Sequence, residues 1–151
     1  MKKILFVCHG NICRSPSAEF IFKDLVKKNG VEESFYIASA ATSTEEIGNP
    51  VYPPMRRELA KHGIGCDGKR AAQITRADYD KYDLIIGMDG ANIRNMLRIF
   101  GSDPDGKIKK LMDYTGKGGD VADPWYSDRF DVAYADILKG CEGLFESLRS
   151  K

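Results

Sequence analysis

The sequence predicts a single doubly wound α/β domain over residues 1–151, with a four-stranded, mostly parallel sheet and helices on both faces. Two observations predict this fold class. Residues 4–7 (ILFV) and 83–88 (DLIIGM) are apolar runs of the kind found in strands that are buried on both faces. Segments with apolar residues at every third or fourth position follow these runs, so strands and helices alternate along the chain.

The first part of the chain supplies a strand, a helix and a second strand. The strand at residues 4–7 precedes a helix for which Ser15 is a suitable N-cap and Pro16 a suitable first residue. Asn and Gly at positions 29–30 end this helix. We expect the second strand at residues 35–41.

The middle of the chain continues the same alternation. A loop rich in Ser, Thr, Gly and Pro covers residues 42–54, and two prolines open a helix that runs to about residue 62. The pattern TRAD at residues 75–78 resembles a capping box for a short helix. The apolar strand at residues 83–88 comes next, followed by a helix at residues 91–100.

The C-terminal part begins with a weaker strand at residues 107–112, which is typical of a sheet edge. A loop rich in Gly and Asp at residues 114–123 leads to the sequence Pro-Trp-Tyr. The last helix is the clearest, because its apolar residues recur every three or four positions in one stripe: Phe130, Tyr134, Ile137, Cys141, Leu144 or Phe145, and Leu148.

Composition excludes several classes of function. The chain has 23 basic and 22 acidic residues, whereas general nucleic-acid binders carry a marked basic excess. No apolar run approaches the ~18 residues of a membrane span, and the N-terminus does not resemble a signal peptide. We therefore expect a cytoplasmic protein without nucleic-acid or membrane partners. Its four cysteines could form two disulfides, but a chain of this kind more often keeps its thiols reduced.

The loop between the first strand and the first helix contains residues suited to binding an anion. It reads CHGNICRSP from Cys8 to Pro16, and we expect it to curl toward the N-terminus of the helix that follows. Gly10 and Asn11 tolerate the left-handed backbone that such a curl requires. The backbone N–H groups, the helix dipole and the fork of Arg14 would surround a phosphate-like dianion and favour a thiolate at Cys8 beneath it.

The Cys-x5-Arg spacing alone is weak evidence, because it arises readily by chance. The buried strand before it, the Ser-Pro helix start after it and the Gly-Asn pair within it are independent requirements that are all met. The alternative is that Cys8 is a small buried side chain and Arg14 a surface residue.

Residues 7–19 (VCHGNICRSPSAE) resemble the signature of the low-molecular-weight protein tyrosine phosphatases. Further similar segments follow in family order: 39–42 (SAAT), 47–50 (IGNP), 61–64 (KHGI), 73–75 (QIT), 88–89 (MD), Asn92 and 123–126 (DPWY). The resemblance implies the family's four-stranded parallel α/β domain. It also implies a phosphoric monoester hydrolase that acts on phosphotyrosine-containing proteins and small aryl phosphates.

The resemblance assigns roles to particular residues. Cys8 would be the nucleophile that forms a phosphocysteine, Arg14 the phosphate clamp, and Asp123 the general acid and then the base. The phosphate would bind to a loop made of His9, Gly10, Asn11, Ile12, Cys13, Arg14 and Ser15. No metal or cofactor is expected. Inorganic phosphate would be the product or a competitive inhibitor, and a monomer is the default.

The resemblance further implies a supporting network of Asn11, Ser15, Ser39 and His62 that holds the loop rigid. Taken alone, each residue has an ordinary interpretation; His62, for example, is a favourable residue at a helix C-terminus.

Cys13 lies where the family commonly has a cysteine that forms a reversible disulfide with the nucleophile, protecting it from irreversible oxidation. The alternative is that Cys13 is a packed side chain. Cys66 and Cys141 are interpreted as structural.

Four residues at the expected substrate cleft bear on specificity. His9 follows the nucleophile where Leu or Thr is more familiar, and it would be a titratable rim residue or simply solvated. Glu45 replaces an aromatic residue of eukaryotic relatives, which predicts poorer selectivity among phosphotyrosine peptides. Trp125 and Tyr126 would either stack on a substrate ring or anchor their loop to the core.

Three other functions remain open from the sequence. An arsenate reductase of this fold needs a close pair of additional cysteines, which Cys66 and Cys141 do not form in the sequence. A protein-arginine phosphatase carries Thr where this chain has Ile12, and the apolar residue favours tyrosine. A thiol redox or phosphate-sensing module without catalysis would need no proton donor such as Asp123.

Overall fold

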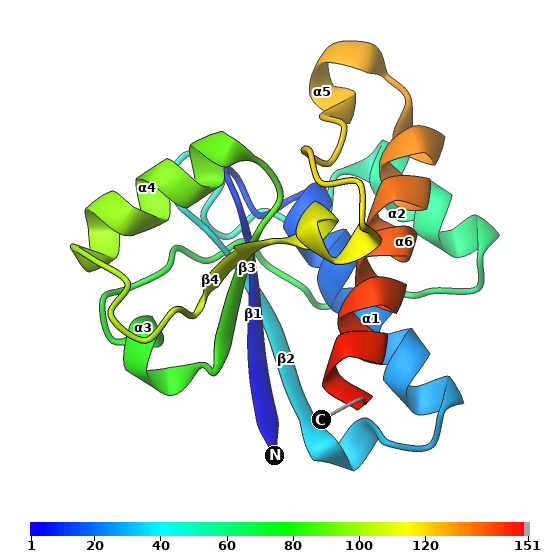
Figure 1. The fold of residues 1–151 in the computed structure, drawn as a ribbon. Helices are drawn as coiled ribbons and strands as arrows, with labels where there is room; N and C mark the ends of the chain where they lie inside the picture. Colours follow the sequence, from blue (N-terminus) through cyan, green and yellow to red (C-terminus); the bar gives the residue numbers. More distant parts are fainter. Residues whose placement is uncertain (150–151) are drawn as a thin grey trace.

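In the computed structural model, which describes residues 1–149, the chain forms one four-stranded parallel sheet with helices on both faces (Figure 1). The strands are β1 (Lys2–Cys8), β2 (Phe35–Ala41), β3 (Leu84–Gly87) and β4 (Ile108–Lys110). Their order is β2-β1-β3-β4, and every neighbouring pair is parallel. The predicted doubly wound α/β class is confirmed.

The helices agree with the sequence pattern in most places. They are α1 (Arg14–Lys28), α2 (Pro53–Lys61), α3 (Asp78–Lys81), α4 (Gly90–Phe100), α5 (Pro124–Ser127) and α6 (Phe130–Arg149). The short helix α5 was not predicted, and a 3-10 turn, Leu111–Thr115, takes the end of the expected strand at residues 107–112. In the described part of the chain, no helix has the length and apolarity needed to cross a bilayer.

The start of α1 differs from the prediction. Cys13, not Ser15, is the N-cap residue, and Pro16 is the third residue of the helix. Ser15 lies inside the first turn with its hydroxyl turned toward Cys8, so it serves the loop and not the helix end. The first turn tolerates Pro16 because its N–H would have no partner within the helix.

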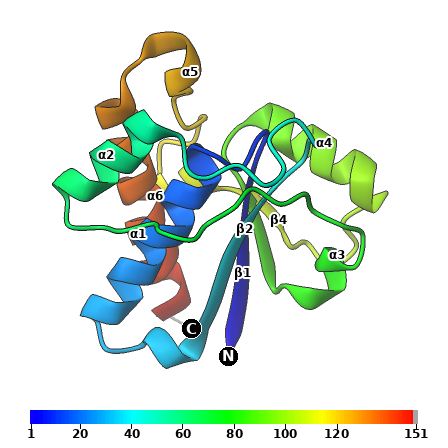
Figure 2. The same cartoon turned by 180° about the vertical axis from the view of Figure 1, so that it is seen from behind.

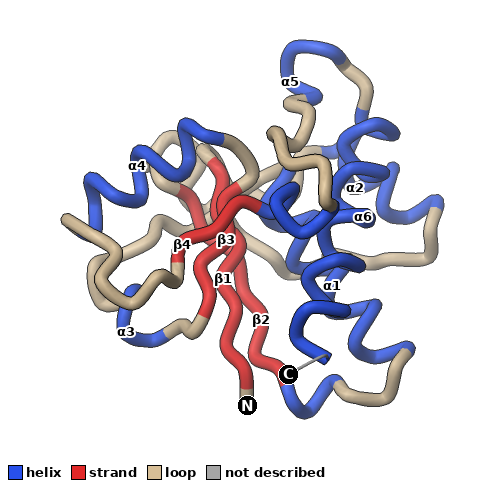
Figure 3. The backbone as a smooth tube through the Cα atoms, in the orientation of Figure 1, coloured by secondary structure: helices blue, strands red, loops and turns tan. Residues whose placement is uncertain are grey.

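The alternating side chains of β1 divide the core into two parts. Ile4, Phe6 and Cys8 pack against α1, α2 and α6, whereas Leu5 and Val7 face the side covered by α3 and α4. Figures 2 and 3 show the two groups of helices on opposite sides of the strands.

The strand order reverses at β1, because the chain crosses first to β2 on one side and then to β3 on the other. Ligands of open α/β sheets bind outside the carboxyl ends of the strands at such a reversal. Cys8 is the last residue of β1, and the loop that follows it lies at this point.

The C-terminal helix packs closely on the 3-10 turn through glycines. A methyl group on Gly143 would overlap the carbonyl oxygen of Tyr114, and one on Gly140 would overlap the side chain of Leu111. This contact holds the start of the segment that leads to Asp123 against α6.

We expect Gly143→Ala to destabilise the protein, although Ala is the better helix former by about 1 kcal/mol. The overlap with Tyr114 should lower the free energy of unfolding by about 1–3 kcal/mol. For a domain of this size, this corresponds to a fall in Tm of roughly 2–12 °C, measured by circular dichroism. Glu142→Ala, at the exposed neighbouring position, is the control and should leave Tm nearly unchanged; an equal Tm for both variants would contradict the close approach.

Candidate active site

The loop after β1 is held by backbone hydrogen bonds to the segment that follows β2. The carbonyl oxygen of Cys8 accepts from the N–H of Thr42 at 3.0 Å, and that of Ile12 accepts from the N–H of Tyr52 at 2.8 Å. Both ends of the loop are therefore tied to neighbouring structure, which limits the freedom of the residues between them.

The sulfur of Cys8 lies within reach of three donors. The N–H of Asn11 is 3.3 Å and the N–H of Ser15 is 3.4 Å from Sγ, and the Ser15 hydroxyl oxygen is 3.0 Å away. Donors of this kind favour a charged thiolate over a neutral thiol. Cys8 is thus in a position to act as a nucleophile.

One of the two residues expected to adopt left-handed backbone geometry does so. Asn11 has a φ of 59°, and this turn brings its N–H toward the sulfur of Cys8. Gly10 is not left-handed, but it permits a close approach, since a Cβ there would lie 3.3 Å from the side chain of Glu46.

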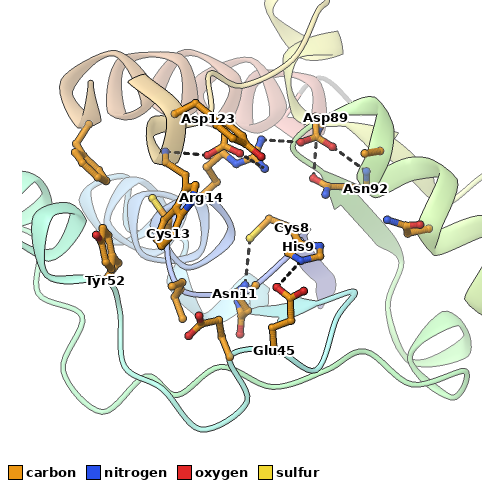
Figure 4. Close-up of a pocket in the computed structure, with 18 residues that line it drawn as sticks. Cys8, His9, Asn11, Cys13, Arg14, Glu45, Tyr52, Asp89, Asn92 and Asp123 are labelled. Atoms are coloured by element: carbon orange, nitrogen blue, oxygen red, sulfur yellow. Dashed lines mark hydrogen bonds and ion pairs between the residues drawn. The ribbon is translucent and has the colours of Figure 1, made fainter. Parts of the chain in front are cut away.

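Arg14 is buried and held by two carboxylates. Its Nη1 donates to Asp89 Oδ2 at 2.8 Å, and its Nη2 lies 3.7 Å from Asp123 Oδ2 (Figure 4). Burial disfavours the charged guanidinium, but the nearby Cys8, Asp89 and Asp123 outweigh it and raise the pKa of Arg14. The side chain therefore remains a cation beside the Cys8 sulfur.

Asp123 is the N-cap of α5, and its side chain is partly exposed at the pocket. Its Oδ1 accepts from the N–H of Trp125 at 3.0 Å, while Oδ2 faces Arg14. The residue precedes Pro124 and has the extended backbone that this position predicts, with φ −91° and ψ 104°. One carboxylate oxygen is thereby fixed, and the other faces the pocket's cation.

Three members of the predicted supporting network are brought together. The Asn11 side-chain amide donates to the hydroxyl of Ser15 at 2.8 Å and to that of Ser39 at 2.9 Å. The Ser39 hydroxyl in turn donates to the carboxylate of Glu19 at 2.6 Å. Glu19 is thus a member of the network that the sequence did not predict.

The structure does not bring His62 into this network. Its Nε2 lies 3.1 Å from Glu58 Oε2, and its ring stacks on Tyr134 with 3.8 Å between centroids. The reason is local, because His62 caps the end of α2 on the face that packs against α6. Its ordinary interpretation, a residue favoured at a helix C-terminus, describes its position.

The four cysteines are unpaired, and two of them lie at the loop. Burial first, and then the nearby Cys8, raise the pKa of Cys13, so this residue is a neutral thiol at neutral pH. Cys66 and Cys141 pack in the core away from the pocket, in agreement with a structural role. Among the described residues, no three His, Cys, Asp or Glu side chains are grouped to hold a metal ion.

A cavity of about 520 Å³ opens above the loop. Its wall contains all four predicted cleft residues, and His9 Nε2 lies 2.9 Å from Glu45 Oε2 across one rim. Trp125 stays 63% exposed and contacts the ring of Tyr52, with 5.5 Å between centroids, while Tyr126 is 87% exposed. These two aromatics therefore belong to the mouth of the pocket and not to the core.

Several lining residues were missed by sequence reasoning: Glu46, Tyr52, Asp89, Ala91, Asn92, Asn95 and Phe130. Asp89 had a detectable signal. It caps α4, and Asp89 and Asn92 exchange backbone-to-side-chain bonds in a capping box. Asn92 shares this signal and Glu46 is next to the predicted Glu45, whereas Tyr52, Ala91, Asn95 and Phe130 have no local signal of their own.

Comparison with known proteins agrees with this geometry. The family model described as low molecular weight phosphotyrosine protein phosphatase matches residues 3–151. The low molecular weight protein-tyrosine-phosphatase YfkJ of Bacillus subtilis is 40% identical over 100% of this chain and 98% of its own length. A low molecular weight phosphotyrosine protein phosphatase of Rattus norvegicus is 41% identical over 96% and 94%.

A solved structure is also closely similar. The crystal structure of Bacillus subtilis YfkJ superposes with a TM-score of 0.95, covering 99% of this chain and 96% of that one at 40% identity.

Proposed function

The chain belongs to the low molecular weight phosphotyrosine protein phosphatase family and is a protein-tyrosine-phosphatase, and we propose that Cys8, Arg14 and Asp123 carry out its chemistry. The observation that carries the assignment is the convergence of the three side chains on one cavity. The Cys8 sulfur lies at its floor among N–H and O–H donors, with the Arg14 guanidinium and the Asp123 carboxyl on the same wall (Figure 4).

In the first step, the Cys8 thiolate attacks phosphorus in line with the aryl oxygen. The S–P bond forms as the P–O bond to the phenol breaks, and Asp123 gives its proton to the leaving oxygen. Arg14 and the loop N–H groups stabilise the charge on the equatorial phosphoryl oxygens. The products are a phosphocysteine and the dephosphorylated tyrosine.

In the second step, the Asp123 carboxylate takes a proton from water as the water oxygen attacks phosphorus. The P–O bond forms and the S–P bond breaks, which returns the thiolate and releases inorganic phosphate. The Ser15 hydroxyl, 3.0 Å from Sγ, stabilises the departing sulfur. Phosphate is thus the product and, at high concentration, a competitive inhibitor.

We extend the proposal to redox protection. A peroxide would oxidise the Cys8 thiolate to a sulfenic acid, and Cys13 would then displace water to form a Cys8–Cys13 disulfide that a thiol reductant reverses. The neutral state of Cys13 supports this order of events, because only Cys8 is then the first target. Reversal of the disulfide requires a thiol reductant of the kind that the cytoplasm supplies. We therefore propose a cytoplasmic location, and a monomer as the working form.

We expect Cys8→Ser to abolish hydrolysis of an aryl phosphate, because a neutral serine hydroxyl cannot replace the thiolate nucleophile. Phosphate binding should survive, since Arg14 and the loop N–H groups remain. Turnover of p-nitrophenyl phosphate and calorimetric titration with inorganic phosphate measure the two effects. Cys66→Ala, away from the pocket, should retain turnover; substantial residual activity in Cys8→Ser would remove Cys8 as the nucleophile.

Asp123→Asn should slow cleavage by roughly 10²–10⁴-fold for substrates with poor leaving groups, and much less for good ones. The amide keeps the hydrogen bond that caps α5 but has no proton to transfer. Rates for a series of aryl phosphates with phenols of different acidity measure this dependence.

Asp120→Asn is the matched control, because Asp120 lies in the same loop but does not line the pocket. A loss in Asp123→Asn that does not depend on the leaving group would contradict the general-acid role.

Glu45→Tyr should improve the use of phosphotyrosine peptides. It replaces one partner of the exposed His9–Glu45 pair with a ring that can pack on the substrate. An added aromatic contact predicts a KM lower by about 2- to 10-fold at similar kcat. Glu33→Tyr, on the exposed turn before β2, is the control; equal KM values for the wild type and Glu45→Tyr would refute the rim assignment.

A further inference from the structure

Two oppositely charged side chains lie behind the phosphate loop and outside the cavity. Glu19, on α1, is 5% exposed, and the Lys69 side chain is 13% exposed. The Lys69 ammonium donates to the carbonyl oxygen of Ser39 at 2.9 Å and lies 3.7 Å from Glu19 Oε1. Neither residue lines the pocket, so neither has a part in the mechanism above.

The carboxylate of Glu19 determines the direction of the hydrogen bond that it accepts. An ionised carboxylate only accepts, so the proton of the Ser39 hydroxyl points to Glu19 Oε1. The lone pairs of Ser39 are then left for the side-chain amide of Asn11, which donates to them.

The amide of Asn11 is consequently held at both ends. Its Oδ1 accepts from the N–H of Ala72 at 3.1 Å, and its two N–H bonds reach Ser39 and Ser15. The Ser15 oxygen accepts there, so its own proton can point to the sulfur of Cys8 at 3.0 Å, which is closer than its other acceptor, the carbonyl oxygen of Ala40 at 3.5 Å.

Protonation of Glu19 would upset this arrangement. A neutral carboxyl can donate a hydrogen bond to the Ser39 hydroxyl oxygen. The Ser39 proton would then turn toward the side-chain nitrogen of Asn11, so that the O–H of Ser39 and the N–H of Asn11, both donors, would face each other. A buried carboxylate takes up a proton unless a cation stays close to it.

We propose that Lys69 is a positioning residue of the phosphatase reaction: its ammonium pairs with the carboxylate of Glu19, and Glu19, through Ser39 and Asn11, keeps the donors of the loop directed at the Cys8 sulfur. The inference rests on the proposed role of Cys8 as nucleophile. Burial lowers the pKa of Lys69 while Glu19 acts in the opposite direction, in line with a cation that depends on this partner.

Lys69 is better placed for this role than the other cation at Glu19. Lys23 contacts Oε2 at 2.6 Å, but its side chain is 44% exposed against 13% for Lys69, so solvent screens its ion pair more. Lys69 is close to Oε1, the oxygen that accepts from Ser39, and it also holds the Ser39 backbone. The segment that carries Lys69 ends at Ala72, which bonds to Asn11 directly.

The test compares Lys69→Gln with Lys69→Arg in the full chain. Gln can still donate to the Ser39 carbonyl but has no charge, whereas Arg restores the charge. We expect Lys69→Gln to lower kcat for p-nitrophenyl phosphate about tenfold with KM changed less than about twofold, and Lys69→Arg to recover most of kcat. The pH midpoint for alkylation of Cys8 by iodoacetamide should rise in Lys69→Gln.

Lys61→Met is the matched control, because Lys61 pairs with the other buried glutamate, Glu58, far from the loop. It should match the wild type in kcat and in the alkylation midpoint. Adding Glu19→Gln to Lys69→Gln should cause no loss beyond that of Glu19→Gln alone, since both residues act through the same carboxylate.

Three results would overturn the proposal. The first is a wild-type kcat and a wild-type pH midpoint of Cys8 alkylation in Lys69→Gln. The others are an equal loss of kcat in Lys69→Gln and Lys69→Arg, or additive losses of kcat when Glu19→Gln and Lys69→Gln are combined. Melting curves of each variant separate these results from simple unfolding. A wrong assignment of Cys8 as the nucleophile would give a different result, namely residual hydrolysis of p-nitrophenyl phosphate by Cys8→Ser.

Discussion

The left-handed backbone of Asn11 is the constraint on which the site depends. At this residue the chain turns back over the end of β1, and the turn directs an N–H group to the Cys8 sulfur. Such geometry costs about 1 kcal/mol or more for a residue with a Cβ, so neighbouring contacts must hold it. The side-chain amide of Asn11 makes those contacts with Ser15, Ser39 and Ala72. The loop is therefore formed before any phosphate arrives.

The electrostatics of the cavity wall depend on one buried cation that faces two carboxylates. Arg14 is the buried cation of the wall, and Asp89 and Asp123 both face it. Asp89 also caps α4, so it is held in place whether or not a ligand is bound. Asp123 lies at a longer distance from Arg14 and keeps a partly exposed side chain at the pocket. The same guanidinium thus has one carboxylate partner in a direct hydrogen bond and a second at longer range.

Much of this arrangement could be predicted from the sequence because the signals are local. Apolar runs, helix periodicity and turn residues determined the strand and helix positions, and the Cys8-to-Arg14 loop lies between two such elements. The network behind the loop has no local signal. Glu19 and Lys69 look like ordinary surface residues, and only the fold brings α1 and the segment after α2 together. His62 was misplaced for a different reason. Glu58 is its neighbour one turn earlier on the same helix, and only the contact with Tyr134 depends on how α2 meets α6.

The mouth of the cavity has two chemically different sides. On one side Tyr52 and Trp125 pack against each other, and on the other the charged pair His9–Glu45 spans the rim. Under the proposed function, a phosphotyrosine ring above Cys8 would meet an aromatic surface on one side and an exposed ion pair on the other. The proposed phosphate loop and these rim residues belong to different segments of the chain, so substitutions at the rim should change the contact with the ring and leave the loop intact.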